Sequence, residues 1–268
     1  MLTLDELFDF FWRDYRSTTP DAGRIHALLE GRGERVVNDH VALRTFDIAP
    51  LSLARLAEPF VELGYRASGT YAFEDKQLDA RSFSHPSGSY PRVFISELRT
   101  RRFSPAFQRA VSDLARQVPR GRTGLALLTE LPSWPPVTFE LYESLLAESE
   151  YAAWLSAFGL RVNHFTVSFN ALTTFPALAS LNDYLEGNGF PLNASGGKVK
   201  GTPAALLEQS STLASRVPWE FAGGERHVVP TCYYEFARRY PDPRTGALYD
   251  GFVAASADKL FESTDAKR

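Results

Sequence analysis

Two stretches of this chain repeat the same order of predicted elements, and this repeat restricts its fold more than any other feature. In each stretch a strand that carries a histidine, His40 or His164, leads into an amphipathic helix. Each helix ends at a glycine followed by an aromatic residue, as helix C-termini commonly do. Gly64 follows His40 by 24 residues, and Gly189 follows His164 by 25 residues. Both stretches continue through extended segments to a late strand with a glutamate, which indicates a duplicated unit.

A single unit of this kind has one helix and cannot cover both faces of its strands. Pairing the two units encloses the uncovered face as a cleft, so we predict an α+β fold in which two βαβββ-like repeats form a half-open barrel with extra helices. The predicted segments are an N-terminal helical segment at 1–35, the first repeat at 36–130, a connecting helical segment at 131–160, the second repeat at 161–252 and a C-terminal tail at 253–268.

Composition and charge exclude several classes of protein. Hydrophobic residues make up 44% of the chain and include 20 Phe, 11 Tyr and 4 Trp, enough for a large aromatic core. The net charge of -3 gives no general attraction to nucleic acid, and no apolar run approaches the about 18 residues of a membrane span. Cys232 is the single cysteine, and no secretory signal precedes the first helix. We therefore expect a cytoplasmic protein without nucleic-acid or membrane partners, and leave open whether it forms a homo-oligomer.

Three polar residues on the predicted strands form a candidate set of metal ligands. His40 and His164 occupy corresponding places in the two repeats, and Glu235 lies on the late strand of the second. Side chains alternate along a strand, so His164 and Thr166 face one way and Phe165 faces the core. Two imidazoles and one carboxylate are the facial triad that holds ferrous iron in oxygen-using enzymes and leaves coordination positions open. We predict a catalytic Fe(II) centre at His40, His164 and Glu235.

Other polar residues are candidates for binding a substrate. Alternation places Arg44 on the face of His40, roughly 13 Å along the strand. It places the acids Asp39 and Asp47 on the opposite face, so we expect the guanidinium to hold a carboxylate of the substrate through a bidentate pair. The remaining candidates come from one dense polar run and are Gln209, Ser210 and Ser211.

The motifs around these residues resemble a known family. The segments 38–46, 163–167, 207–214 and 233–240 are similar to those of the 2-oxoadipate dioxygenase/decarboxylases, within the vicinal oxygen chelate superfamily. The resemblance extends over most of 36–252 and marks the chain as a short form, since the better-known bacterial members are longer and build part of their substrate pocket from a further C-terminal region.

The resemblance implies a single catalytic domain over 1–268 with a vicinal-oxygen-chelate-like fold. It further implies a non-haem Fe(II) enzyme of lysine catabolism that converts 2-oxoadipate and O₂ into 2-hydroxyglutarate and CO₂. His40, His164 and Glu235 take the positions of the metal ligands, and Arg44 takes that of the substrate-binding arginine. Ligand counting agrees, because three protein ligands leave room on octahedral iron for a chelating 2-oxo acid and O₂.

Two other functions stay open on the sequence. A glyoxalase-type metal-dependent isomerase or lyase would use Glu97 as a fourth protein ligand, because Glu97 is expected to occupy the place of Glu235 in the first repeat. A non-catalytic small-molecule-binding protein of the same fold would enclose an apolar ligand between the repeats and bind no metal.

Overall fold

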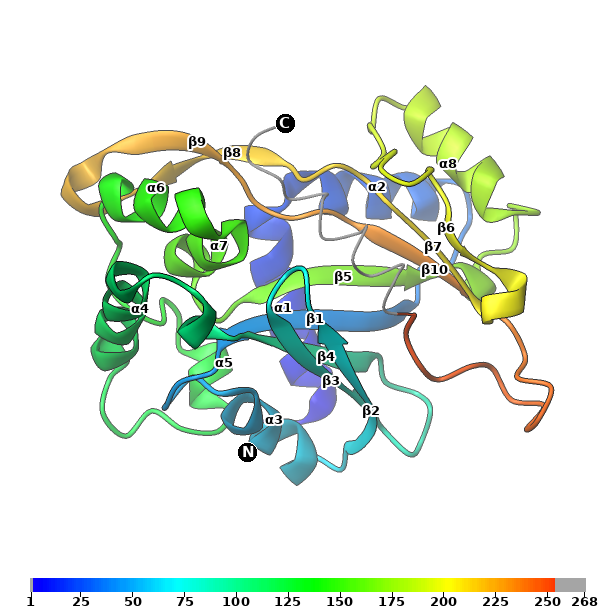
Figure 1. The fold of residues 1–268 in the computed structure, drawn as a ribbon. Helices are drawn as coiled ribbons and strands as arrows, with labels where there is room; N and C mark the ends of the chain where they lie inside the picture. The colour runs from blue at the N-terminus through cyan, green and yellow to red at the C-terminus, as the bar shows by residue number, and fades with distance from the viewer. Residues whose placement is uncertain (1, 254–268) are drawn as a thin grey trace.

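The computed structural model describes residues 2–253 and contains one mixed sheet, a separate hairpin and several helices (Figure 1). The strands of the sheet are β1 (Asn38–Phe46), β2 (Arg66–Phe73), β3 (Leu78–Ser84), β4 (Arg92–Leu98), β5 (Val162–Ser168), β6 (Lys200–Thr202), β7 (Leu207–Ser211) and β10 (Glu235–Arg239). The hairpin consists of β8 (Arg216–Glu220) and β9 (Arg226–Pro230). The helices are α1 (Leu4–Thr18), α2 (Pro20–Gly31), α3 (Leu53–Glu62), α4 (Pro105–Gln117), α5 (Ala126–Thr129), α6 (Phe139–Glu148), α7 (Glu150–Phe158) and α8 (Leu178–Gly187).

The eight-stranded sheet divides between β1 and β5 into two halves of the same design. Its order is β2-β3-β4-β1-β5-β10-β7-β6. From the centre outward, each half contains the histidine strand, then the last strand of its repeat, then the two remaining strands. In both halves these two strands are parallel, while β1 and β5 pair antiparallel at the centre. The α+β fold with two βαβββ units and a vicinal-oxygen-chelate-like arrangement is thereby confirmed. The β8–β9 hairpin is an insertion before β10 that the sequence repeat did not reveal.

One face of the central strands belongs to the hydrophobic core. Phe165 of β5 contacts Trp12 and Tyr15 of α1, with ring centroids 5.2 and 5.1 Å apart. The Thr3 hydroxyl and the Glu6 carboxylate form a capping box that starts α1. Because side chains alternate, the neighbours of Phe165 face the other way, into the cleft. The core therefore holds β5 rigidly and leaves its opposite face to polar groups.

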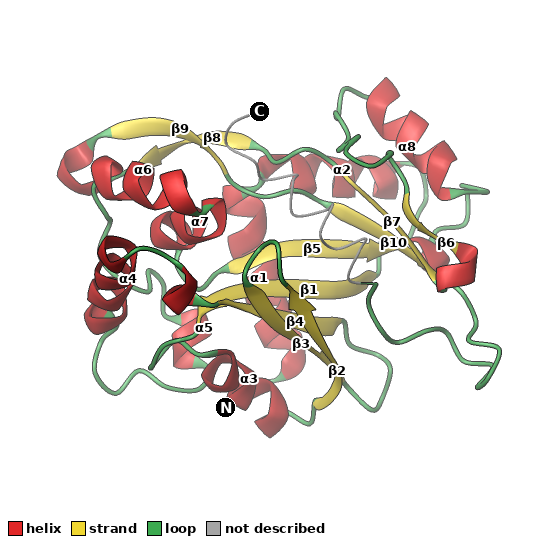
Figure 2. Ribbon diagram, viewed as in Figure 1, coloured by secondary structure: helices red, strands yellow, loops and turns green. Residues whose placement is uncertain are grey.

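Helices close the ends of the sheet. The α6 and α7 helices lie beside the β8–β9 hairpin, α4 contacts α6 on the side away from the hairpin, and α8 lies at the other end near β6 (Figure 2). Tyr151 of α7 reaches the sheet, where its hydroxyl accepts a hydrogen bond from the Thr45 amide at 3.0 Å and donates to the Ser96 carbonyl at 2.7 Å. This fixes α7 over one end of β1. Over residues 2–253, each helix is too short or too polar to cross a bilayer. The predicted tail lies outside the described residues, apart from its first residue.

Candidate metal centre

The side chains of His40, His164 and Glu235 converge at the centre of the sheet. His40 comes from β1, His164 from β5 and Glu235 from β10, and each is 5% exposed or less. His40 Nε2 lies 3.6 Å from Glu235 Oε1, and His164 Nε2 lies 3.4 Å from Glu235 Oε2. One ligand atom from each residue lies within 4.8 Å of the others. The structure thus brings together the three side chains of the predicted ligand set.

Strand register explains this convergence. His40 lies opposite Thr166 on β5, and Glu235 lies opposite the same threonine from the other side. His164 lies opposite Ala42, which follows His40 by two residues on β1 and therefore lies on the same face. Paired residues share a face and neighbouring strands are about 4.8 Å apart, so three adjacent strands carry their polar side chains to one point.

In both repeats the residue before the histidine orients its ring. Asp39 Oδ1 lies 2.8 Å from His40 Nδ1, and Asn163 Oδ1 lies 3.0 Å from His164 Nδ1. Both oxygens are acceptors, so each Nδ1 carries the proton and each Nε2 offers its lone pair to the centre. Metal-binding histidines are usually held in this way. Two such nitrogens and a buried carboxylate are a donor set that fits a divalent metal ion.

The protonation of these groups also suits metal binding. Burial lowers the pKa of His164 well below its ordinary value, and the nearby His40 ring and Arg44 guanidinium add to this lowering, so the His164 imidazole stays neutral. Burial raises the pKa of Glu235, while His40 and a hydrogen bond from Gln209 oppose that rise. A divalent cation beside the carboxylate would remove the cost of burying its charge.

A buried ion pair supports His40 from behind. Arg239 donates to both carboxylate oxygens of Asp39, at 2.7 and 2.8 Å, and both side chains are at most 3% exposed. Burial would raise the pKa of Asp39, but the charge of Arg239 and the hydrogen bond from His40 hold it far below its usual range. Arg239 also donates to the carbonyls of Tyr249 and Gly251, so it ties the loop after β10 to the centre.

Simple alternation predicted the position of Asp39 incorrectly. In the pairing of β1 with β5, Asn38 lies opposite Val167 and His40 opposite Thr166, so two residues of β1 advance against one of β5. This bulge turns Asp39 toward the ring of His40, whereas a regular strand would point it to the opposite face. Arg239 at 2.7 Å and Arg92 at 3.5 Å are then its ionic partners.

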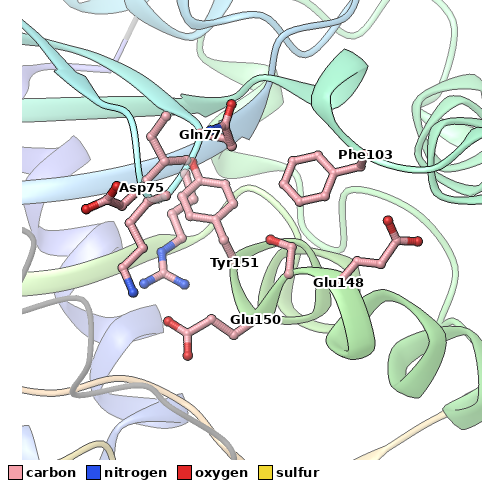
Figure 3. A pocket seen from close by; sticks show the side chains of 10 residues that line it. Asp75, Gln77, Phe103, Glu148, Glu150 and Tyr151 are labelled. Carbon is pink, nitrogen blue, oxygen red and sulfur yellow. The ribbon is translucent and has the colours of Figure 1, made fainter.

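Arg44 lies on the same strand as His40 and is 2% exposed. Its guanidinium packs over the rings of Tyr151 and Trp154, at 4.9 and 5.1 Å from their centroids. Arg44 also lines a cavity of about 210 Å³ between the β2–β3 turn and the start of α7, where Gln77, Glu150 and Tyr151 contribute to the wall (Figure 3). The aromatic rings hold the guanidinium plane beside this cavity.

The predicted polar run on β7 divides between the two faces of the sheet. Gln209 Nε2 donates to Glu235 Oε1 at 2.6 Å, and Ser211 is buried directly opposite Glu235. Ser210 faces away, where its hydroxyl donates to Asn182 Oδ1 on α8 at 2.8 Å. Gln209 and Ser211 are therefore at the candidate centre, and Ser210 is not, because adjacent residues of a strand point to opposite faces.

Glu97 lies away from the centre, and its expected equivalence to Glu235 is wrong. Phe94 is the residue of β4 that corresponds to Glu235, since each lies opposite the residue two positions after the histidine of the paired strand. Glu97 lies three residues further along β4. There its carboxylate accepts a hydrogen bond from the Leu53 amide at 2.8 Å, at the start of α3.

The residues that orient the histidines were not singled out from the sequence, although a signal for them exists. An Asp or Asn stands directly before the histidine in both repeats, as Asp39-His40 and Asn163-His164. A repeated acceptor beside a repeated ligand indicates a shared hydrogen bond.

Replacing Asn163 with alanine should weaken divalent metal binding by roughly 10- to 100-fold, because His164 loses the acceptor that fixes its ring. Titration of the metal-free protein with Fe(II) or Mn(II) against a competing chelator would measure this. Asn188→Ala at the exposed end of α8 is the control and should keep the affinity of the unchanged protein. Equal affinities in all three proteins would contradict a role for Asn163.

Comparisons with known proteins agree on one family. The chain matches the family described as 2-oxoadipate dioxygenase/decarboxylase over residues 13–120 and 121–242. A protein of Oryza sativa named 2-oxoadipate dioxygenase/decarboxylase, chloroplastic/amyloplastic, is 35% identical in an alignment 275 residues long, which covers 93% of this chain and 75% of that protein. The crystal structure of the hydroxyglutarate synthase from Oryza sativa, in complex with 2-oxoadipate, has a TM-score of 0.90 and 33% identity, covering 97% of this chain and 91% of that one. A structure from Shewanella frigidimarina, described only as a candidate hydrolase, has a TM-score of 0.87 and 47% identity, covering 95% and 99%.

The matched regions contain the whole candidate centre. His40 falls in the first matched region, and His164 and Glu235 fall in the second. The family match covers most of this chain, and the alignment with the rice protein covers 93% of this chain. This chain therefore belongs to the 2-oxoadipate dioxygenase/decarboxylase family.

Proposed function

We propose that this protein is an Fe(II)-dependent dioxygenase/decarboxylase that converts 2-oxoadipate and O₂ into 2-hydroxyglutarate and CO₂, as a step of lysine catabolism. The observation that carries the proposal is the convergence of two imidazole nitrogens and one carboxylate on a single point, with a buried arginine on the strand of His40. Membership of the family supports the choice of substrate, since the rice relative with 33% identity was crystallised with 2-oxoadipate.

His40, His164 and Glu235 would hold the iron. When bound, iron with one open face supplies a Lewis acid that a 2-oxo acid can chelate and a centre at which O₂ can be reduced. Gln209 positions the carboxylate by donating to Glu235 Oε1, and Asp39 and Asn163 keep both imidazoles in the tautomer that offers Nε2. The protein thus presents three preorganised donors before the substrate arrives.

Arg44 would bind the carboxylate at the far end of the substrate. A six-carbon diacid whose 2-oxo end lies at the metal needs a cation for its other end, and Arg44 follows His40 along β1. The rings of Tyr151 and Trp154 exclude water from one side of the guanidinium, which strengthens a charge-assisted pair. Holding both ends fixes the reacting carbon at the metal.

The two alternative functions lack such support. The glyoxalase-type alternative needs a carboxylate from the first repeat, and Phe94 stands at that position. The binding-protein alternative places an apolar ligand between the repeats. That ligand would contact buried polar groups that it cannot hydrogen-bond, namely His40, His164, Glu235 and Gln209.

The product mixture tests the proposal. Fe(II)-loaded protein is incubated separately with 2-oxoadipate, 2-oxoglutarate and 4-hydroxyphenylpyruvate while O₂ uptake, CO₂ release and hydroxy acids are followed. We expect 2-oxoadipate to yield one CO₂ and one 2-hydroxyglutarate for each O₂ consumed. CO₂ release without O₂, or uncoupled O₂ uptake with every acid, would contradict the reaction, and preference for another acid would contradict the substrate.

Arg44→Lys should lower kcat/KM for 2-oxoadipate by roughly 10- to 100-fold and leave the iron content unchanged, because lysine keeps the charge but loses the planar fork. Steady-state kinetics with metal analysis of the same samples would measure both quantities. Arg55→Lys is the control, because this α3 side chain is 37% exposed and pairs with Glu58. Parallel loss of iron and activity in Arg44→Lys would point to a structural role instead.

A further inference from the structure

A buried hydroxyl beside the candidate centre has no hydrogen-bond partner among the described residues. Tyr233 is 1% exposed, yet within residues 2–253 its hydroxyl makes no hydrogen bond. Leaving a buried hydroxyl unpaired costs stability, and such groups are rare in native proteins. A ligand that accepts a hydrogen bond from this hydroxyl would explain why a tyrosine rather than a phenylalanine stands here.

The ring of Tyr233 lies against the metal-ligand set. It stacks on the ring of His164, with centroids 4.7 Å apart and planes inclined by 27°. Its backbone carbonyl accepts a hydrogen bond from the Tyr15 hydroxyl, which anchors this residue from the core side. Tyr233 lies just before β10, and its contact with the His164 ring places its side chain on the side of the metal-ligand set.

The segment before β10 also passes close to Arg44. Trp154, whose ring lies 5.1 Å from the Arg44 guanidinium, donates a hydrogen bond to the carbonyl of Thr231, two residues before Tyr233. A phenol hydroxyl is a hydrogen-bond donor. Tyr233 therefore belongs to a segment that contacts both the candidate centre and the surroundings of Arg44.

We propose that the Tyr233 hydroxyl donates a hydrogen bond to a carboxylate or keto oxygen of the bound 2-oxo acid and helps to fix the acid between the metal centre and Arg44. This inference rests on the proposed function for the identity of the ligand. The ring and the backbone of Tyr233 make its contacts within the described residues, so the hydroxyl is available for the substrate.

The next residue provides a matched control. Tyr234 is equally buried but faces the core, where its ring packs 5.8 Å from Trp12 and 5.5 Å from Phe236. Its hydroxyl lies 3.5 Å from His26 Nδ1, away from the centre. Tyr234→Phe removes the same atom from the adjacent residue, whose ring packs in the core.

The test compares Tyr233→Phe with Tyr234→Phe by two measurements that need no turnover. Calorimetric titration of 2-oxoadipate into anaerobic Fe(II)-loaded protein should give a Kd roughly 10- to 100-fold higher for Tyr233→Phe, as expected for a lost hydrogen bond to a charged group, and an unchanged Kd for Tyr234→Phe. The Tm of metal-free Tyr233→Phe should equal or exceed that of the unchanged protein, because the hydroxyl loses no protein partner. A Kd for Tyr233→Phe close to that of the unchanged protein, or a lower Tm, would overturn the proposal.

The outcomes separate this inference from the proposed function. If the unchanged protein binds 2-oxoadipate but does not release CO₂ with O₂, the proposed reaction fails and the Tyr233 contact is still decided by the two Kd values. If turnover is as proposed and Tyr233→Phe binds normally, only the Tyr233 contact fails. If the unchanged protein binds no 2-oxo acid, both are overturned.

Discussion

Replacing Glu235 with glutamine will remove most of the bound iron and nearly all turnover while the protein stays folded. Glutamine keeps the shape of the side chain but loses the anionic oxygen that binds a divalent cation. The loss of Fe(II) affinity should exceed the roughly 10- to 100-fold expected for a residue that only orients a ligand. Metal-free Glu235→Gln should be no less stable than the unchanged protein, because burial already raises the pKa of Glu235 and an amide avoids a buried charge. Metal analysis, kinetics and thermal unfolding measure the three effects.

Glu97→Gln is the matched control for this experiment. Glu97 is a half-buried glutamate of the first repeat that contacts the start of α3. Its substitution should leave iron content and turnover unchanged. Loss of iron in Glu97→Gln equal to that in Glu235→Gln would instead support a fourth protein ligand and a glyoxalase-type centre.

Asp39→Ala should have the largest effect on stability. It leaves the buried guanidinium of Arg239 without its ionic partner, which typically costs about 3–5 kcal/mol. For a protein of this size the Tm should fall by roughly 6–20 °C. His40 also loses the acceptor at Nδ1, so metal affinity should fall as well.

A second substitution separates these two effects. In Asp39→Ala/Arg239→Met the unpaired charge is removed, so much of the lost stability should return. Metal affinity should stay low, because His40 still lacks its acceptor. Differential scanning calorimetry and metal titration of both variants provide the comparison, and a double variant less stable than Asp39→Ala alone would contradict the ion pair as the cause.

The sequence predicted the features that depend on local periodicity. The alternation of His164 and Thr166 with Phe165 gave the two faces of β5, and the duplicated order of elements gave the two halves of the sheet. Both are properties of short segments, which is why they can be read without a partner strand. The convergence of the histidines then followed from pairing the two repeats.

Features that depend on register or on distant partners were missed or misplaced. The bulge at Asp39 is a property of two paired strands, and Asp39 meets Arg239 across 200 residues. Glu97 was matched to Glu235 by its place late in a strand, whereas the pairing of β4 with β1 decides the correspondence. Ser210 was grouped with its neighbours in sequence, although strand alternation alone would have separated it from Gln209.

The most direct test of the central claim is an anaerobic crystal structure of the protein with Fe(II) and 2-oxoadipate, with diffraction collected at the iron absorption edge. We expect a single anomalous peak bound by His40 Nε2, His164 Nε2 and one oxygen of Glu235, at about 2.0–2.2 Å, the range usual for nitrogen and oxygen ligands of such metals. The 2-oxo end of the acid should share that metal, and its far carboxylate should meet Arg44. A peak elsewhere, or a fourth protein ligand in place of the acid, would contradict it.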